Sequence, residues 1–148
     1  MAKKSRVYRS LYRLIRYPLE ALMVALVFVI FYFLPVDASS RLGGMLSRWL
    51  GPRLGYQKWA IISLSRAFPN LKGKQIKEIT DGMWDNLGRV LGELPHLKKI
   101  TRERVKISNE EILTSLTANG GPCIFFTGHF GNWELLALTA QRLNTPYL

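Results

Sequence analysis

The stretch that decides the expected fold reads Pro122-Cys123-Ile124-Phe125-Phe126-Thr127-Gly128-His129-Phe130-Gly131-Asn132-Trp133-Glu134. Its first six residues form a short apolar run behind the turn signal Asn119-Gly120-Gly121, which predicts a buried strand. Asn132 is a favourable N-cap, and the residues up to Leu143 predict a largely apolar helix. The stretch therefore predicts a strand, a turn and a helix, as in an α/β fold.

This predicted corner is also where chemistry is expected. Residues five apart on one helix do not share a face, but a corner containing Gly128 and Gly131 can fold Glu134 back onto His129. A neutral imidazole accepts a proton from a hydroxyl when a carboxylate fixes its tautomer and stabilises the imidazolium. The pattern predicts His129 as the general base and Glu134 as its partner, in acyl transfer to an alcohol or amine. A structural histidine beside a glutamate that interacts with the helix dipole is the alternative.

Further residues are expected to support this site. Backbone N–H groups of Gly131, Asn132 and Trp133, at the helix start, would favour a developing oxyanion or a bound anion. The segment Asn86-Leu87-Gly88-Arg89 and Glu93 are candidates for polar support from an earlier helix. Solvated surface residues would produce the same pattern.

The second half of the chain predicts alternating strands and helices. Val105–Ser108 predicts a short strand, and the capping box Ser108-Asn109-Glu110-Glu111 begins a helix that ends near Asn119-Gly120. With the corner described above, the order is strand, helix, strand, helix, which is typical of a parallel α/β layer.

Three helices are expected before that layer. They cover residues 37–50, ended by Gly51-Pro52, residues 54–68, ended by Pro69, and residues 74–94, ended by Pro95. The last places one apolar face opposite a charged one; the apolar face comprises Ile76, Ile79, Met83, Leu87, Val90, Leu91 and Leu94. Trp49 and Trp59 fit either a lipid-facing platform or ordinary core packing.

The N-terminus predicts attachment to a membrane. Residues 1–16 carry six basic residues and no acid, and an apolar run from Leu19 to Leu34 follows between Pro18 and Pro35. This run is shorter than the roughly 20 residues of an upright span. We expect an uncleaved anchor, because Ala38-Ser39-Ser40 makes a weak cleavage site for a signal peptide. Basic residues on both sides leave the orientation open and favour a shallow or interfacial helix.

Composition narrows the possible partners. The net charge of +11 over 148 residues favours anionic partners such as lipid headgroups, an acidic carrier protein or nucleic acid. The single cysteine, Cys123, excludes an internal disulfide and is expected in the core. His96 is expected at the surface or as a helix cap. The basic segment Lys98–Lys106 could dock a carrier or a membrane, or be an ordinary solvated run.

The motifs resemble those of the lipid A biosynthesis lauroyl/myristoyl acyltransferase family, within the broader lysophospholipid acyltransferase group. The resemblance covers nearly the whole chain and rests on the N-terminal apolar helix, Arg66-Ala67-Phe68-Pro69, Asn86-Leu87-Gly88-Arg89 with Glu93, and Gly128–Glu134. It implies three parts: residues 1–35 as basic N-terminus and anchor, 36–99 as a helical segment, and 100–148 as the start of a glycerol-3-phosphate acyltransferase-like α/β sheet. Family members continue further, so we expect an N-terminal fragment.

The resemblance also implies the reaction. A fatty acyl group would move from acyl carrier protein or acyl-coenzyme A to a hydroxyl of a lipid-linked sugar, a lipid A precursor, at the cytoplasmic face of the bacterial inner membrane. His129 and Glu134 would be catalytic, Gly131, Asn132, Trp133 and Arg89 would bind substrate or support the oxyanion, and no metal or other cofactor is expected.

Other functions remain as alternatives. Related enzymes acylate other glycolipids, such as phosphatidylinositol mannosides, and a non-catalytic membrane-anchored module would need neither His129 nor Glu134. A metal hydrolase is disfavoured, because this pair supplies two ligands where catalytic zinc generally has three. Nucleic-acid binding is disfavoured by the membrane segment and by the lack of a recognised motif.

Overall fold

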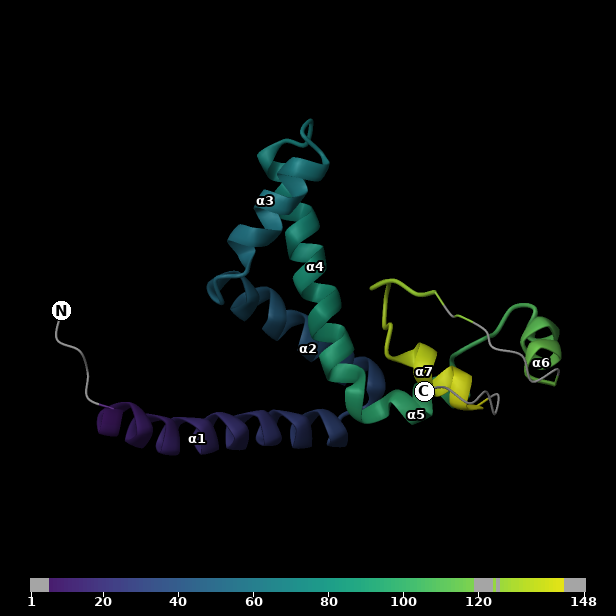
Figure 1. The fold of residues 1–148 in the computed structure, drawn as a ribbon, viewed down its shortest axis with the longest axis horizontal. Coiled ribbons are helices and arrows are strands. Elements are labelled where there is room, and N and C mark those ends of the chain that lie inside the picture. Colours follow the sequence, from purple (N-terminus) through teal and green to yellow (C-terminus); the bar gives the residue numbers. More distant parts are fainter. Residues whose placement is uncertain (1–5, 119–123, 125, 143–148) are drawn as a thin grey trace.

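The N-terminal helix α1 (Arg6–Phe33) extends away from the rest of the chain (Figure 1). The computed structural model describes residues 6–118, 124 and 126–142. Within α1, the 20 residues Leu14–Phe33 have a mean hydropathy of 2.1 and are almost entirely exposed. At 1.5 Å per residue they measure about 30 Å, the thickness of a bilayer's hydrocarbon core. By length and composition, this is the one helix of the described chain that could cross a membrane.

α1 is longer than the run Leu19–Leu34 predicted from the sequence, because Pro18 lies inside the helix and does not begin it. Proline has no N–H, so the carbonyl of Leu14, four residues earlier, lacks its usual intrahelical donor. An ion pair spans the same turn, with Arg16 Nε 2.6 Å from Glu20 Oε1. At the other end, the half-buried His96 donates from Nε2 to the Phe31 carbonyl at 2.8 Å. The expectation of a capping histidine is confirmed, and the helix it caps is α1.

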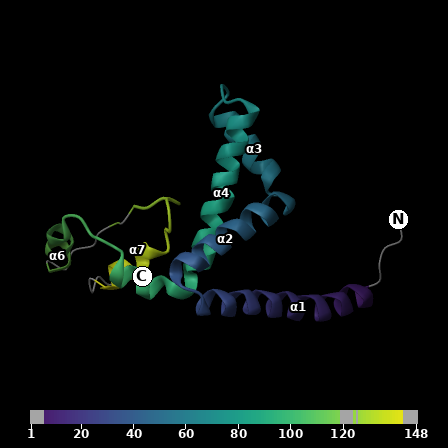
Figure 2. The same ribbon diagram turned by 180° about the vertical axis from the view of Figure 1, so that it is seen from behind.

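The central packing of the molecule joins α2 (Val36–Leu50) to α4 (Gly73–Glu93), which cross closely (Figure 2). Glycines allow the approach: a Cβ on Gly43 would lie 2.1 Å from the carbonyl oxygen of Gly88, and a Cβ on Gly88 would lie 2.2 Å from that of Gly43. Ser39, fully buried, donates from Oγ to the Gly92 carbonyl at 2.6 Å. Small residues one turn apart thus bring the two backbones into contact.

The buried face of α4 is not the aliphatic face that the sequence pattern suggests. Ile79, Met83 and Leu91 are exposed. The buried residues are Thr80, Trp84, Gly88, Val90 and Gly92, of which only Val90 belongs to the predicted apolar face. Periodicity found the helix, but it did not show that Gly88 and Gly92 are the residues that meet the α2 backbone.

α3 (Gln57–Ala67) lies along the first half of α4, after the short helix η1 (Gly51–Arg53). The Gln57 side chain fastens it: Nε2 donates to Thr80 Oγ1 at 3.0 Å, and Oε1 accepts from Trp84 Nε1 at 2.6 Å. Trp49 and Trp59 are 61% and 68% exposed, so the core-packing interpretation of these tryptophans is wrong.

The C-terminal part consists of η2 (Leu94–His96), α5 (Leu97–Glu103), α6 (Glu110–Ala118) and α7 (Leu135–Arg142). α7 packs on α5, whereas α6 stands apart (Figure 1). α5 is linked back to the start of α2 by a two-pronged ion pair: Arg104 Nη1 and Nη2 donate to Asp37 Oδ1 and Oδ2 at 2.6 and 3.1 Å.

The predicted α/β fold, with the start of a parallel sheet, is wrong for the described chain, which is helical and contains no strand among residues 6–118, 124 and 126–142. Residues 105–107 lie in an irregular connection, and the Val105 N–H closes the end of α5 by donating to Ile100 O at 3.2 Å. Residues 124, 126 and 127 are irregular too. A strand needs a partner for its backbone groups, and no backbone hydrogen bond joins the described residues of these two segments. Cys123 lies outside the described residues.

Candidate functional site

The stretch from Thr127 to Glu134 forms an irregular, largely exposed turn before α7, which we call the histidine loop. Its tight bend begins where the Phe130 N–H donates to the Gly128 carbonyl at 2.8 Å. Gly131 follows with φ +53°, a left-handed conformation that favours glycine. Asn132 then accepts the Glu134 N–H on Oδ1 at 3.2 Å, in agreement with its predicted role at the start of a helix.

Two side chains of α4 connect the histidine loop to the central helices. Asn132 donates from Nδ2 to Glu93 Oε2 at 2.7 Å, and Asn86 donates from Nδ2 to the Gly131 carbonyl at 3.2 Å. These bonds join residues 39 and 45 positions apart in the chain. Asn86 and Glu93 therefore hold the loop, as suggested from the sequence.

The Glu93 carboxylate has a second partner that sequence reasoning missed. Its Oε1 accepts from Ser40 Oγ in α2 at 2.7 Å. The Glu93 side chain on α4 thus links Ser40 of α2 to Asn132 of the histidine loop through one hydrogen bond on each carboxylate oxygen. The spacing of Ser39, Ser40, Gly43 and Gly44, a small-residue stripe one turn apart, is the signal that could have indicated close contact with α4.

His129 and Glu134 are both exposed, and the described structure has neither a hydrogen bond nor an ion pair between them. The His129 ring instead lies against Trp133, with 4.6 Å between ring centroids and an interplanar angle of 58°. The loop thus carries both predicted catalytic groups within one turn at the surface. Their catalytic roles stay predictions.

Of the other predicted site residues, Gly131, Asn132 and Trp133 belong to the histidine loop, whereas Arg89 does not contact it through any hydrogen bond of the described structure. Arg89 Nε bonds to Asp85 Oδ2 at 2.5 Å, and Asp85 also faces Arg48 of α2 at 3.4 Å. Substrate binding by Arg89 stays a prediction.

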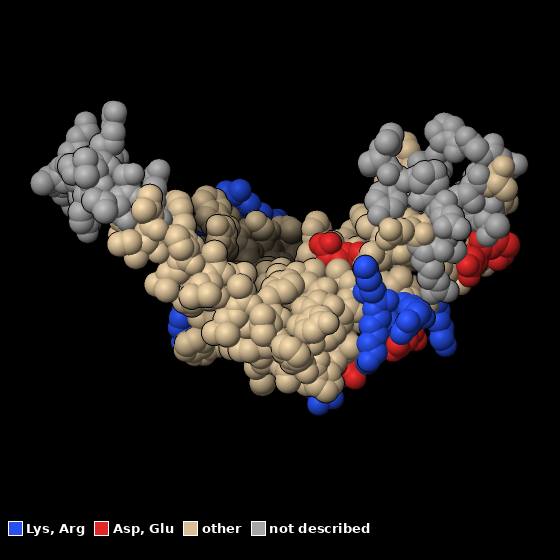
Figure 3. Space-filling view, turned by 90° about the horizontal axis from the view of Figure 1, so that it is seen from below, with Lys and Arg blue, Asp and Glu red and all other residues tan. Residues whose placement is uncertain are grey.

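Basic side chains gather on one part of the surface. Lysine and arginine side chains lie beyond the end of α1, at α5, whereas the surface along the second half of α1 is largely uncharged (Figure 3). Arg104 holds the pKa of Asp37 below its usual value, chiefly through their hydrogen bonds. Among the described residues, no group of three or more His, Cys, Asp or Glu could hold a metal ion.

The chain thus combines an apolar helix that by length and composition could cross a membrane with an exposed loop that carries a histidine and a glutamate. The sequence model of one family, described as bacterial lipid A biosynthesis acyltransferase, matches residues 8–144. The chain therefore belongs to this family of acyltransferases. Neither the curated proteins nor the solved structures gave a match.

Proposed function

We propose that this protein transfers a fatty acyl group from an acyl carrier protein or acyl-coenzyme A thioester to a hydroxyl of a lipid A precursor. The family match supports the reaction class. The observation that carries the proposal is the histidine loop, where His129 and Glu134 lie in one exposed turn fastened by Glu93 and Asn86.

In the proposed reaction, His129 takes the proton of the acceptor hydroxyl while the hydroxyl oxygen attacks the thioester carbonyl carbon. The tetrahedral intermediate then expels the thiolate, and the imidazolium returns the proton to the sulfur. Glu134 would stabilise the imidazolium and fix its tautomer. Catalytic hydrogen bonds are often long in free enzymes and tighten with substrate, so closure of the turn would bring Glu134 to His129.

The site would need no metal or redox cofactor, because the thioester supplies a good leaving group. Gly131, Asn132 and Trp133 would offer backbone N–H groups to the developing oxyanion. The basic surface at α5 suits an acidic carrier protein or anionic headgroups.

The test is transfer of labelled laurate or myristate by membranes that contain the natural gene product. We expect His129→Ala and Glu134→Gln to lower the rate by about 10²-fold or more, since general base catalysis contributes about 10²–10⁴. Glu78→Gln, a change at an exposed glutamate of α4, is the matched control and should leave the rate unchanged. Full activity in His129→Ala would contradict the mechanism. Faster transfer to a phosphatidylinositol mannoside than to a lipid A precursor would contradict the acceptor.

We also propose that α1 attaches the protein to the bacterial inner membrane, with the histidine loop at the cytoplasmic face. The exposed apolar stretch Leu14–Phe33 supports this attachment. Removing residues 1–35 should move most of the protein out of the membrane fraction in sedimentation. Unchanged sedimentation would show that another surface suffices for attachment.

A further inference from the structure

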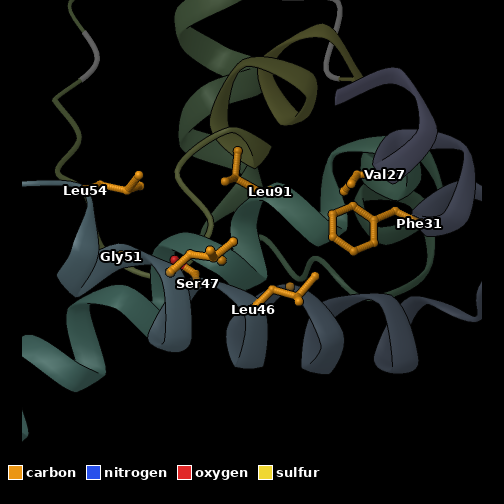
Figure 4. A pocket seen from close by; sticks show the side chains of 10 residues that line it. Val27, Phe31, Leu46, Ser47, Gly51, Leu54 and Leu91 are labelled. Carbon is orange, nitrogen blue, oxygen red and sulfur yellow. The ribbon is translucent and has the colours of Figure 1, made fainter. Parts of the chain in front are cut away.

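Two neighbouring apolar pockets lie between α1, α2 and the second half of α4, and we call them together the α1–α2 groove; Figure 4 shows the first. One part has a volume of about 230 Å³ and the other of about 260 Å³. Val27, Phe31 and Leu91 line both parts, so the two adjoin at these side chains. The first part runs towards Gly51 and Leu54, and the second runs along α1 towards Met23.

The lining of this groove suits hydrocarbon. Apart from glycines and Ser47, every lining residue is aliphatic or aromatic, and none is charged. Gly43, Gly51 and Gly88 keep the floor free of side chains where α2 crosses α4. The size of the groove is on the scale of ligand pockets, about 300–1,000 Å³. The Ser47 hydroxyl is the one polar side-chain group among the lining residues, so the groove suits a chain of methylene groups better than a headgroup.

The position of the groove selects the occupant. One wall belongs to Leu14–Phe33, the stretch that could lie in a membrane, so the groove opens into the hydrocarbon phase beside α1. At the opposite end the lining residues Gly51 and Leu54 flank Arg53 in the chain, and the Arg53 guanidinium covers the Trp49 ring at 4.7 Å and donates to the Trp49 carbonyl. Arg53 has no carboxylate partner in the described part of the chain. Tryptophan and arginine together are typical of the headgroup level of a bilayer, where a cation attracts phosphate.

We propose that the α1–α2 groove binds one acyl chain of an anionic glycerophospholipid, with the lipid phosphate at Arg53. The bound lipid fills the space between the membrane helix and α2. This site uses neither His129 nor Glu134, so it is independent of the proposed acyl transfer.

The test uses the protein in vesicles containing phosphatidylglycerol with a photoreactive diazirine in one acyl chain, followed by mass-spectrometric mapping of the adducts. Adducts should concentrate at Val27, Phe31 and Leu91. Val27→Trp fills the groove and should lower their yield about tenfold, the effect of displacing roughly two buried methylene groups. Val29→Trp is the matched control, because Val29 is exposed on α1 and does not line the groove.

A second comparison tests the headgroup. The same diazirine chain on phosphatidylcholine should label the groove less than it does on phosphatidylglycerol, and Arg53→Gln should remove that difference. An equal loss of labelling in Val27→Trp and Val29→Trp would overturn the proposal. Uniform labelling around the circumference of α1 would also overturn it, since both results are expected for lipid that merely surrounds the helix. Adducts found only on the face of α1 that points away from the groove would show that no lipid enters the groove, and this result would overturn the proposal as well. Equal labelling by both lipids would overturn the anionic preference.

Discussion

Between α2 and α4 the backbones touch, and a methyl group on Gly88 would lie 2.4 Å from the Ser47 Cβ. The histidine loop, by contrast, is joined to α4 by two side-chain hydrogen bonds, while Phe126 and Phe130 are 93% and 87% exposed. Steric contact fixes the first region, so it tolerates little change in volume. Polar bonds fix the second, so it can shift when a substrate offers better partners. The rigid pair thereby provides the platform on which the loop that carries His129 is oriented.

The largest effect on stability should come from disrupting the close contact between α2 and α4. Gly88→Ala should lower the free energy of unfolding by about 2–3 kcal/mol, because the new Cβ would overlap the Gly43 carbonyl and force the helices apart. Gly82→Ala lies in the same helix with nothing near its Cβ and should raise stability by about 0.5–1 kcal/mol. Thermal unfolding of the two variants in the same detergent measures the difference. Equal destabilisation would show that the α2–α4 contact is not decisive.

A smaller effect on stability, with a clear effect on the reaction, is expected from loosening the loop. Glu93→Ala removes both acceptor oxygens, so Ser40 and Asn132 each lose their hydrogen-bond partner. We expect acyl transfer to fall about tenfold or more, since displacing a catalytic group by about 1 Å can cost 10²-fold. Ser40→Ala removes the hydrogen bond on the far side of the same carboxylate and should cost stability about 1 kcal/mol with little loss of rate. A rate loss as large in Ser40→Ala would contradict a positioning role directed at Asn132.

The smallest effect concerns the ion pair between Asp37, at the start of α2, and Arg104, at the end of α5. Arg104 lowers the pKa of Asp37 in the folded protein. The contribution to stability is therefore complete above the usual carboxyl pKa and is lost as the pH falls through the lowered one. Melting temperatures of the natural protein and Asp37→Asn should differ slightly near pH 7 and converge on strong acidification. A gap that persists or widens in acid would contradict this origin.

The sequence predicted the helices better than it predicted their contacts. Proline and glycine punctuation located α2, α3 and α4, because those residues act on the local backbone. It did not reveal which face of α4 is buried, since large aliphatic residues dominate a hydrophobic pattern while Gly88 and Gly92 contribute nothing to it. The described residues 105–107, 124, 126 and 127 form no strand for a related reason: pairing is a long-range property that the local pattern of these segments does not encode.

The candidate site was predictable in composition and less so in geometry. The spacing of His129, Asn132 and Glu134 located the loop, and Asn86 and Glu93 were two of the candidates for its support, with solvated surface residues as the alternative. The contact of His129 with Trp133 was not foreseen, because the orientation of an exposed ring depends on local packing that spacing does not specify. Ser40 was missed because its role depends on the crossing of α2 and α4.

Pro18 has a consequence for the depth of α1 in a bilayer. The Leu14 carbonyl, left without its intrahelical donor, needs water, so we expect it at the level of the headgroups. Glu20, paired with Arg16, belongs at the same level, so the fully dehydrated part of α1 would begin near Ala21 and end at Phe33, a length of about 20 Å. This is shorter than the roughly 30 Å of an average hydrocarbon core. Such a helix would thin the lipid around it, and the protein would partition into thinner membranes in preference to thick ones.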